Sequence, residues 1–223
     1  MATSPRPLGA PEPDAPASPL ACVLWDFGDT LADERWMLEA PAGVTDWARV
    51  WTEVAGTELA DRWNRGEISD REIVRAVAAR LSLDEQAVRS HTRWCCSRIR
   101  FFELPWAVAR RSSLPRALVT VNPDGFSDFV VPRYRLDEIF DAIVTSWEER
   151  TLDKGEMCLT ALRRLGGGIA PREALLVDNK LHNIEAWAAR GGRGYLFRGE
   201  AQFRSDLGGE LRDLARSAKI EPA

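Results

Sequence analysis

Five short runs of apolar residues recur along the chain, and three of them lead directly into polar turns. The runs are uninterrupted, whereas a strand with one exposed face would alternate between apolar and polar positions. Uninterrupted runs of four or five residues are typical of strands that are buried on both faces. We therefore expect five buried strands, at residues 21–25, 117–121, 142–146, 174–177 and 194–197.

Helical periodicity separates the later runs, at about residues 155–165 and 181–190. Strands that alternate with helices form a parallel sheet with crossover helices. We therefore predict an α/β fold with a doubly wound, Rossmann-like and mainly parallel sheet. Because ligands of such sheets bind beyond the carboxyl ends of the strands, the polar residues that follow the strands should meet in one crevice.

Residues 33–104 have a different pattern, with helical periodicity throughout and five of the nine tryptophans. We interpret this segment as a helical cap that covers the crevice, excludes water and contacts the substrate. The first nineteen residues hold six of the thirteen prolines and too little apolar surface to offset the entropy of ordering. The expected organisation is a disordered Pro/Ala-rich tail at 1–19, an α/β core formed by 20–32 and 105–223, and a helical cap at 33–104.

Composition and charge narrow the classes of function. The chain has 223 residues, of which 45% are hydrophobic and 29% charged, as in globular proteins with a full core. Its formal net charge of −4 argues against a nucleic-acid partner, because binding to phosphate backbones needs massed Lys and Arg. With no apolar stretch long enough to span a bilayer and no visible signal peptide, we expect no membrane partner. Four cysteines without metal-ligand spacing favour reduced thiols and a cytoplasmic location. The sequence does not set the oligomeric state.

Asp26 opens the polar segment DFGDTL at residues 26–31, directly after the first predicted strand. An aspartate at such a strand end can act as a covalent nucleophile, as a metal ligand, or merely as a cap of the following turn. The segment resembles the first motif of the haloacid dehalogenase (HAD) superfamily, in which an apolar strand is followed by Asp, any residue, Asp, Gly, Thr and Leu.

The other strand ends are similar to the remaining HAD motifs, in the same order along the chain. Thr120 matches the second motif, whose hydroxyl would donate to a phosphoryl or carboxylate oxygen. Lys154 matches the third, whose ammonium would neutralise charge between the nucleophile and a bound anion. The segment DNKLHN at 178–183 matches the fourth. Taken singly, these residues have simpler interpretations, namely a strand-favouring threonine, a surface lysine and a helix cap. However, only three of the 30 basic residues are lysines, which makes an incidental lysine at 154 less expected.

The resemblance covers residues 20 to about 198 and implies a hydrolase that acts on a small, anionic substrate. Asp26 would attack the substrate and form a covalent aspartyl intermediate, which water would then hydrolyse. In the phosphatases of the superfamily, magnesium bridges the nucleophile, the backbone carbonyl two residues on and the fourth-motif acid, all oxygen ligands that suit a hard ion. By this resemblance, a magnesium-dependent phosphatase of a small phosphoester is expected. The implied catalytic residues are Asp26, Asp29, Thr120 and Lys154, the substrate-binding residues are Thr120, Asn122 and Lys154, and the metal ligands are Asp26, Gly28, Asp178 and Asn179.

Departures from the HAD pattern leave alternatives open. Phosphatases of the superfamily carry a second aspartate two residues after the first, as an acid and base. This chain has Gly28 there, so either Asp29 takes over that role or the acid is missing. Asn179 stands where the superfamily usually has the metal-binding acid, so that Asp178 or the neutral Asn179 must serve, and Gly155 stands where many relatives have proline. One alternative is therefore a weakened or inactive HAD-like binding protein, and another is a metal-independent hydrolase of the dehalogenase type.

Overall fold

A five-stranded, all-parallel sheet with the order β3-β2-β1-β4-β5 forms the centre of the protein. The computed structural model describes residues 19–220 except residue 57, so the tail predicted at 1–19 lies outside the described residues apart from residue 19. Each strand begins and ends within one residue of its predicted position. The strands are β1 (Cys22–Trp25), β2 (Arg116–Thr120), β3 (Ala142–Thr145), β4 (Ala174–Asp178) and β5 (Arg193–Leu196).

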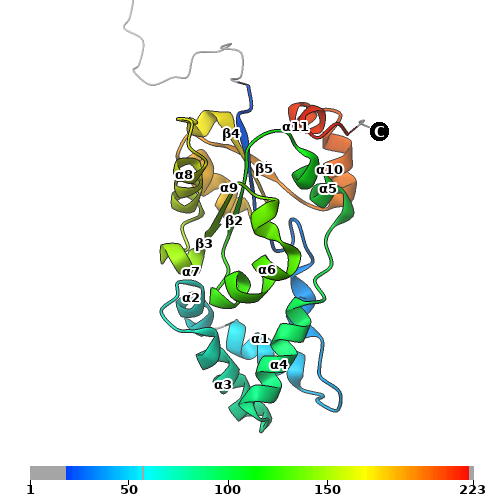
Figure 1. Ribbon diagram of the computed structural model, residues 1–223, viewed down its shortest axis with the longest axis vertical. Helices are drawn as coiled ribbons and strands as arrows, with labels where there is room; N and C mark the ends of the chain where they lie inside the picture. Colours follow the sequence, from blue (N-terminus) through cyan, green and yellow to red (C-terminus); the bar gives the residue numbers. More distant parts are fainter. Residues whose placement is uncertain (1–18, 57, 221–223) are drawn as a thin grey trace, which may run out of the picture.

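Helices cover both faces of the sheet, which confirms the predicted doubly wound α/β fold (Figure 1). The α-helices of this part are α5 (Glu103–Arg111), α6 (Val131–Tyr134), α7 (Ser146–Glu149), α8 (Lys154–Leu165), α9 (Leu181–Ala188), α10 (Glu200–Asp206) and α11 (Arg212–Ser217). Shorter elements join them: the π-helical turn η2 (Phe126–Val130) and the 3-10 turns η3 (Leu136–Glu138) and η4 (Pro171–Glu173).

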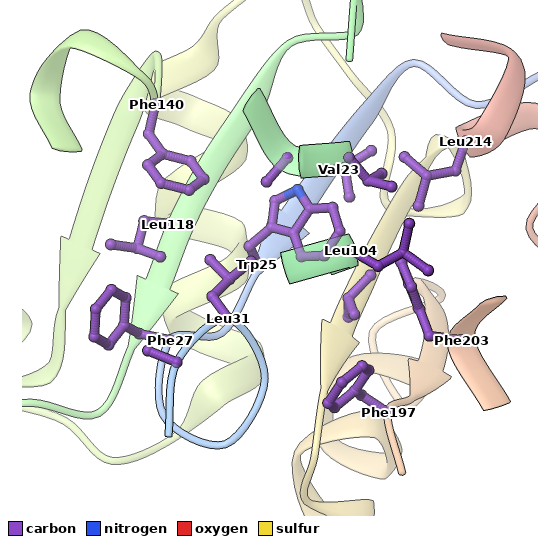
Figure 2. Packing of buried hydrophobic residues seen from close by; sticks show 14 of the residues in the cluster. Val23, Trp25, Phe27, Leu31, Leu104, Leu118, Phe140, Phe197, Phe203 and Leu214 are labelled. Carbon is purple, nitrogen blue, oxygen red and sulfur yellow. The ribbon is translucent and has the colours of Figure 1, made fainter. Parts of the chain in front are cut away.

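The two faces of the sheet belong to two separate hydrophobic layers, because successive strand residues point to opposite sides. On one face, Trp25 lies at the centre of a layer with side chains of α5, α10 and α11, as Figure 2 shows. Its ring meets that of Phe203 edge-on, with centroids 6.2 Å apart. Cys22 and Leu24 point to the other face, against α8 and α9. Every β1 side chain is therefore fully buried, as its uninterrupted apolar run predicted.

Gly155 lies where α8 and α9 approach each other closely, which explains one departure from the HAD pattern. A Cβ at this position would lie 2.8 Å from the carbonyl oxygen of Ala186 and 2.7 Å from the guanidinium carbon of Arg190. The amide of Gly155 also donates to Asp153 Oδ1 at 2.9 Å, a bond that proline cannot make. A proline at 155 would therefore push α8 away from α9 and remove part of its N-terminal cap.

The chain between β1 and α5 is helical and has a hydrophobic core of its own, which agrees with the helical pattern of residues 33–104. The rings of Trp47 and Trp51 stack in this core with centroids 5.7 Å apart. We call this part the cap; its exact domain boundaries stay a prediction. Its elements are the 3-10 turn η1 (Glu34–Leu38) and the helices α1 (Trp47–Ala55), α2 (Glu58–Asn64), α3 (Asp70–Leu81) and α4 (Glu85–Cys96).

The cap contacts the core at the carboxyl edge of the sheet, below the strands in Figure 1. Ser146, directly after β3, donates its hydroxyl to the Asn64 carbonyl oxygen at 2.6 Å. Asp124, in the loop after β2, accepts from the indole nitrogen of Trp63 at 3.2 Å. The residues that follow the strands are therefore enclosed between the core and the cap.

Two further findings concern the helices and the cysteines. No helix among the described residues combines the length and apolar character needed to cross a bilayer. All four cysteines are buried free thiols. Burial raises the pKa of the Cys96 thiol to about 12, so this thiol stays protonated at neutral pH.

Candidate active site

Asp26 follows β1 at the centre of the sheet, and only 7% of the residue's surface is exposed. Its amide donates to the carbonyl oxygen of Val177 at 3.0 Å and so continues the pairing of β1 with β4. The hydroxyl of Thr30 donates to Asp26 Oδ2 at 3.3 Å. No backbone amide of the described chain donates to the Asp26 carboxylate, so the interpretation of Asp26 as a turn cap does not hold.

Lys154 is the first residue of α8 and is buried, with 1% of its surface exposed. Its Nζ donates to Asp26 Oδ1 and to the carbonyl oxygen of Val119, both at 2.7 Å. The same ammonium lies 3.1 Å from Asp178 Oδ2. Burial alone would lower the pKa of Lys154, but the carboxylates of Asp26 and Asp178 raise it above its usual range. Lys154 is thus a buried cation held between two carboxylates, and the surface-lysine interpretation is excluded.

The pKa of Asp26 is raised above the usual range of an aspartate. Burial is the largest cause, and the nearby Asp178 carboxylate acts in the same direction. The positive charge of Lys154 opposes both effects. Asp26 therefore depends on Lys154 to keep its carboxylate ionised in a site that is largely shielded from water.

Asp178 ends β4 and is completely buried, and its carboxylate is fully used by neighbouring groups. Asn183 Nδ2 lies 3.0 Å from each of its oxygens. The amide of Lys180 donates to Oδ1 at 2.8 Å. With the ion pair to Lys154, these contacts leave Asp178 as a group that positions Lys154 rather than one that is open to a ligand.

Asn179 follows Asp178 in the chain but, unlike Asp178, has an oxygen without a partner. Its Oδ1 is buried and has no hydrogen-bond partner in the part of the chain that the structure describes. An acceptor in this state needs a donor or a cation from outside the protein. Because β1 and β4 are neighbours with Trp25 paired to Val177, Asn179 and Asp26 leave the same edge of the sheet side by side.

These groups decide how far the site suits magnesium. Nowhere in residues 19–220, residue 57 aside, do three or more His, Cys, Asp or Glu side chains gather as metal ligands. Asp178 is fully bonded, which leaves three of the expected ligands: the carboxylate of Asp26, the backbone carbonyl of Gly28 and the amide oxygen of Asn179. Magnesium is often held through one or two protein ligands, with water and substrate phosphate completing its shell. The residues present fit an ion of this kind, held with a single charged ligand.

Thr120 and Asn122 lie at the end of β2 and just beyond it. Thr120 is buried, and Asn122 Nδ2 donates to its Oγ1 at 2.7 Å. Because Asn122 uses a lone pair of this hydroxyl, the hydroxyl hydrogen stays available for an acceptor. The two residues therefore place a hydroxyl donor at the carboxyl edge, and its role towards a substrate oxygen stays a prediction.

Asp29 and Gly28 belong to the turn that follows β1. Asp29 is exposed, has the left-handed backbone angle φ 50°, and accepts from the amide of Glu34 at 3.0 Å through Oδ1. Its carboxylate makes no hydrogen bond or ion pair with Asp26 or Lys154. Gly28 is buried and forms an isolated bridge with Ala32.

A pocket of about 450 Å³ lies between the cap and the core, and of the site residues described above Asn122 lines it. Core residues such as Asn122 and Phe126 line one side, and cap residues line the other. Three tryptophans, Trp36, Trp51 and Trp63, contribute to its wall. Apart from Glu34, Asp70 is the only acidic residue among its lining residues. The pocket is therefore mainly aromatic and apolar.

Asp70 in this pocket gives a pH-dependent stability prediction. Burial, together with the carboxylate of Asp124, raises its pKa to about 6. An unfolded aspartate ionises near pH 4, so the folded state loses stability as the pH rises from about 4 through about 6. Asp70→Asn should therefore raise the midpoint of thermal unfolding at pH 7.5 and change it little at pH 4. Asp61→Asn, at an exposed position of α2, is the control; equal effects of Asp70→Asn at both pH values would contradict the assignment.

Similarity to known proteins is found in structure and not in sequence. The chain matches no protein-family model and no curated protein. It is similar to L-2-haloacid dehalogenase from Xanthobacter autotrophicus with chloropropionic acid covalently bound, with a TM-score of 0.60 and 18% identity over 91% of this chain and 90% of that one. A HAD family enzyme from Bacteroides thetaiotaomicron in complex with magnesium and inorganic phosphate matches with a TM-score of 0.56 and 14% identity, over 81% and 95%. A predicted HAD-like family hydrolase from Porphyromonas gingivalis matches with 0.58 and 15%, over 86% and 98%.

At sequence identities of 14–18%, the similarity to these structures shows a shared fold and nothing more. The chain has the α/β fold of the HAD superfamily, as the motif resemblance implied. The similar structures include both a dehalogenase and a magnesium-containing enzyme. The fold alone therefore does not assign a chemistry to this chain.

The structure brings together most of the residues that the sequence singled out. Asp26, Lys154 and Asp178 are in direct contact, and Thr120 with Asn122 and the orphaned Asn179 stand at the same edge. Thr30 and Asn183 lay within the matched motifs but were given no role, and Glu34 was not selected from the sequence. The position of Asn183, five residues after Asp178 and on the first turn of a helix, was a usable signal. No sequence signal marked Glu34.

Proposed function

We propose that this protein is a hydrolase that cleaves a small phosphoester through a covalent aspartyl phosphate on Asp26. The observation that supports it most is the buried contact of Asp26 with Lys154, which keeps a carboxylate ionised at the carboxyl edge of the sheet. Buried carboxylates with raised pKa values and a specific charged partner are concentrated at functional sites.

In the proposed reaction, Asp26 attacks the phosphorus atom and the bond from phosphorus to the leaving oxygen breaks. Lys154 holds Asp26 Oδ1, so that the carboxylate has a fixed orientation before the substrate arrives. The hydroxyl of Thr120 donates to a phosphoryl oxygen, with Asn122 fixing its direction. Water then attacks the aspartyl phosphate and returns Asp26 to its free state.

Magnesium suits this reaction and would be held by the Asp26 carboxylate and Asn179 Oδ1. When bound, it would neutralise charge on the phosphoryl oxygens. The protein contributes only one charged ligand, so we expect weak binding.

The pocket indicates the class of leaving group. Its wall of Trp36, Trp51 and Trp63 offers aromatic surface and few charged partners. Such a wall favours a leaving group that is apolar or aromatic, because burial of apolar surface provides the binding free energy. We therefore expect aryl and hydrophobic alkyl phosphates to be better substrates than sugar phosphates.

A panel of phosphate esters tests this function. The protein would be incubated with magnesium and with aryl, hydrophobic alkyl and sugar phosphates, and the release of inorganic phosphate would be measured. Release from the aryl and alkyl esters is expected. Binding of these esters without any release would instead support the alternative of a HAD-like binding protein.

Asn179→Asp provides a prediction about the metal. A second carboxylate at the edge of the sheet should raise the affinity for magnesium by about 10-fold or more, because affinity for hard cations follows ligand charge. The magnesium concentration at half-maximal heat change in calorimetric titration is the measurement. Gln86→Glu, which adds the same charge on an exposed face of α4, is the control. Unchanged affinity in Asn179→Asp would place the metal elsewhere.

A metal-independent reaction of the dehalogenase type is the second candidate. The observation that favours it is that Lys154 already neutralises Asp26 without a metal, while Asp178 is closed to one. Asp26 would then displace halide from carbon and form an ester. Adding 2-chloropropionate to the panel, with a chelator present, distinguishes the two, since only this reaction would release chloride.

A further inference from the structure

The position two residues after Asp26 has no side chain, yet a carboxyl group occupies the space beside it. A Cβ at Gly28 would lie 2.9 Å from Glu34 Oε1 and 3.0 Å from Glu34 Cδ. An aspartate at position 28 would have to extend its own carboxyl from that same Cβ. Glu34 therefore places a carboxyl close to where a residue at 28 would carry one.

The turn after β1 brings Glu34 back to this place. The amides of Leu31 and Ala32 donate to the Phe27 carbonyl oxygen at 2.9 and 3.0 Å and close the turn. Asp29 then accepts from the backbone amide of Glu34 at 3.0 Å. The carboxylate of Asp29 thus fixes the backbone of Glu34, and the side chain of Glu34 lies over Gly28.

The carboxyl of Glu34 is free to react. It has no hydrogen-bond or ion-pair partner among the described residues, it is accessible to solvent, and it lines the pocket together with Asn122. A carboxyl with these properties, over the position two residues after the nucleophile and open to the pocket, has the placement of an acid and base.

We propose that Glu34 is the general acid and base of this site, in the role that a side chain at position 28 cannot fill. This inference rests on the proposed phosphatase function. In the first step Asp26 bonds to phosphorus, the bond to the leaving oxygen breaks, and Glu34 gives its proton to that oxygen, so that an alcohol leaves. In the second step the Glu34 carboxylate takes a proton from water as the water oxygen bonds to phosphorus. The bond from phosphorus to Asp26 breaks, inorganic phosphate leaves, and Glu34 is protonated again.

The leaving group provides the first test, because an acid matters most for an oxygen that leaves poorly. In Glu34→Gln, kcat/KM for an alkyl phosphate should fall by about 100- to 10,000-fold. The loss for p-nitrophenyl phosphate should be about 10-fold or less, since p-nitrophenolate leaves without a proton. Glu39→Gln, an exposed residue at the end of η1, is the matched control, and thermal unfolding checks that each variant folds.

Gly28→Asp provides the second test. In the wild type this change should give little gain, because the new side chain displaces the carboxyl of Glu34. In the Glu34→Gln background it should restore alkyl phosphate turnover by about 10-fold or more, since the aspartate then supplies the missing acid. Asp29→Asn tests the rival carboxylate directly.

The possible outcomes separate this inference from the proposed function. Equal losses on both substrates in Glu34→Gln, or the leaving-group dependence in Asp29→Asn instead, would overturn the role of Glu34 alone. A double variant as slow as Glu34→Gln would overturn it as well. Hydrolysis that survives Asp26→Asn would overturn the phosphatase function, and with it the reaction in which Glu34 acts.

Discussion

Asp26→Asn should abolish ester hydrolysis, with a loss of kcat of about 10⁴-fold or more, as for other nucleophile substitutions. The amide keeps the shape of the carboxylate but cannot form the aspartyl phosphate. It also removes the negative charge that Lys154 contacts at 2.7 Å. Phosphate release under saturating substrate is the measurement, and beryllium fluoride should form an adduct detectable by fluorine NMR with the wild type only.

Asp213→Asn is the matched control for this prediction. Asp213 is an exposed carboxylate of α11, where it pairs with Arg216. We expect wild-type turnover in this variant. If Asp26→Asn retained turnover near that of Asp213→Asn, Asp26 would not be the nucleophile, and the fold alone would remain established.

Lys154→Met should produce the largest loss of stability of any single change in the site. It leaves Asp26 and Asp178 buried next to each other without the ammonium that lies 2.7 and 3.1 Å from them. Removal of one partner from a buried ion pair typically costs about 3–5 kcal/mol of unfolding free energy. Urea denaturation at pH 8 is the measurement, and turnover should be lost in parallel.

The pH dependence of this loss identifies its cause. Without Lys154, burial and the Asp178 charge are opposed by the weaker effect of Lys180, so the pKa of Asp26 rises further. A folded-state pKa above the unfolded value makes stability decrease as the pH rises through that range. The destabilisation by Lys154→Met should therefore be smaller at pH 5 than at pH 8, and Asp178→Asn added to it should recover part of the stability.

Arg163→Met is the control for Lys154→Met. Arg163 is an exposed cation on the same helix α8, and its loss should change stability by about 0.5 kcal/mol or less. A loss in Lys154→Met that is small and independent of pH would mean that the two carboxylates are already protonated in the folded protein.

The strands and the edge at which the site forms were predictable because burial on both faces leaves an uninterrupted apolar pattern in the sequence. Asp26 follows such a strand, and Thr120 and Asp178 end two others. Adjacent parallel strands bring their carboxyl ends together, whatever the arrangement of the helices that pack on the sheet. Lys154 was predictable only through the resemblance to the HAD motifs. Its burial and its contact with two carboxylates required the packing of α8 against the sheet.

The cap shows a second limit of prediction from the sequence. Its helical periodicity was visible, and so was its wealth of tryptophan. Which tryptophans face the pocket was not, because Trp47 is completely buried in the cap core while Trp51 and Trp63, at similar helical spacing, also reach the pocket wall. Periodicity assigns a residue to one face of a helix, but it does not say whether that face meets the cap core, the pocket or both.

The sequence by itself determined the α/β fold, the positions of the five strands and the polar edge with Asp26 at its centre, because these depend on local patterns of burial. Only the tertiary structure decided that Glu34 fills the space beside Gly28, that Asp178 is closed by Asn183 and Lys154, and that Asn179 is left with an unsatisfied oxygen. These facts depend on distances between residues of different elements. Such distances follow from the way a turn closes and two layers pack, which no local pattern of apolar and polar residues records.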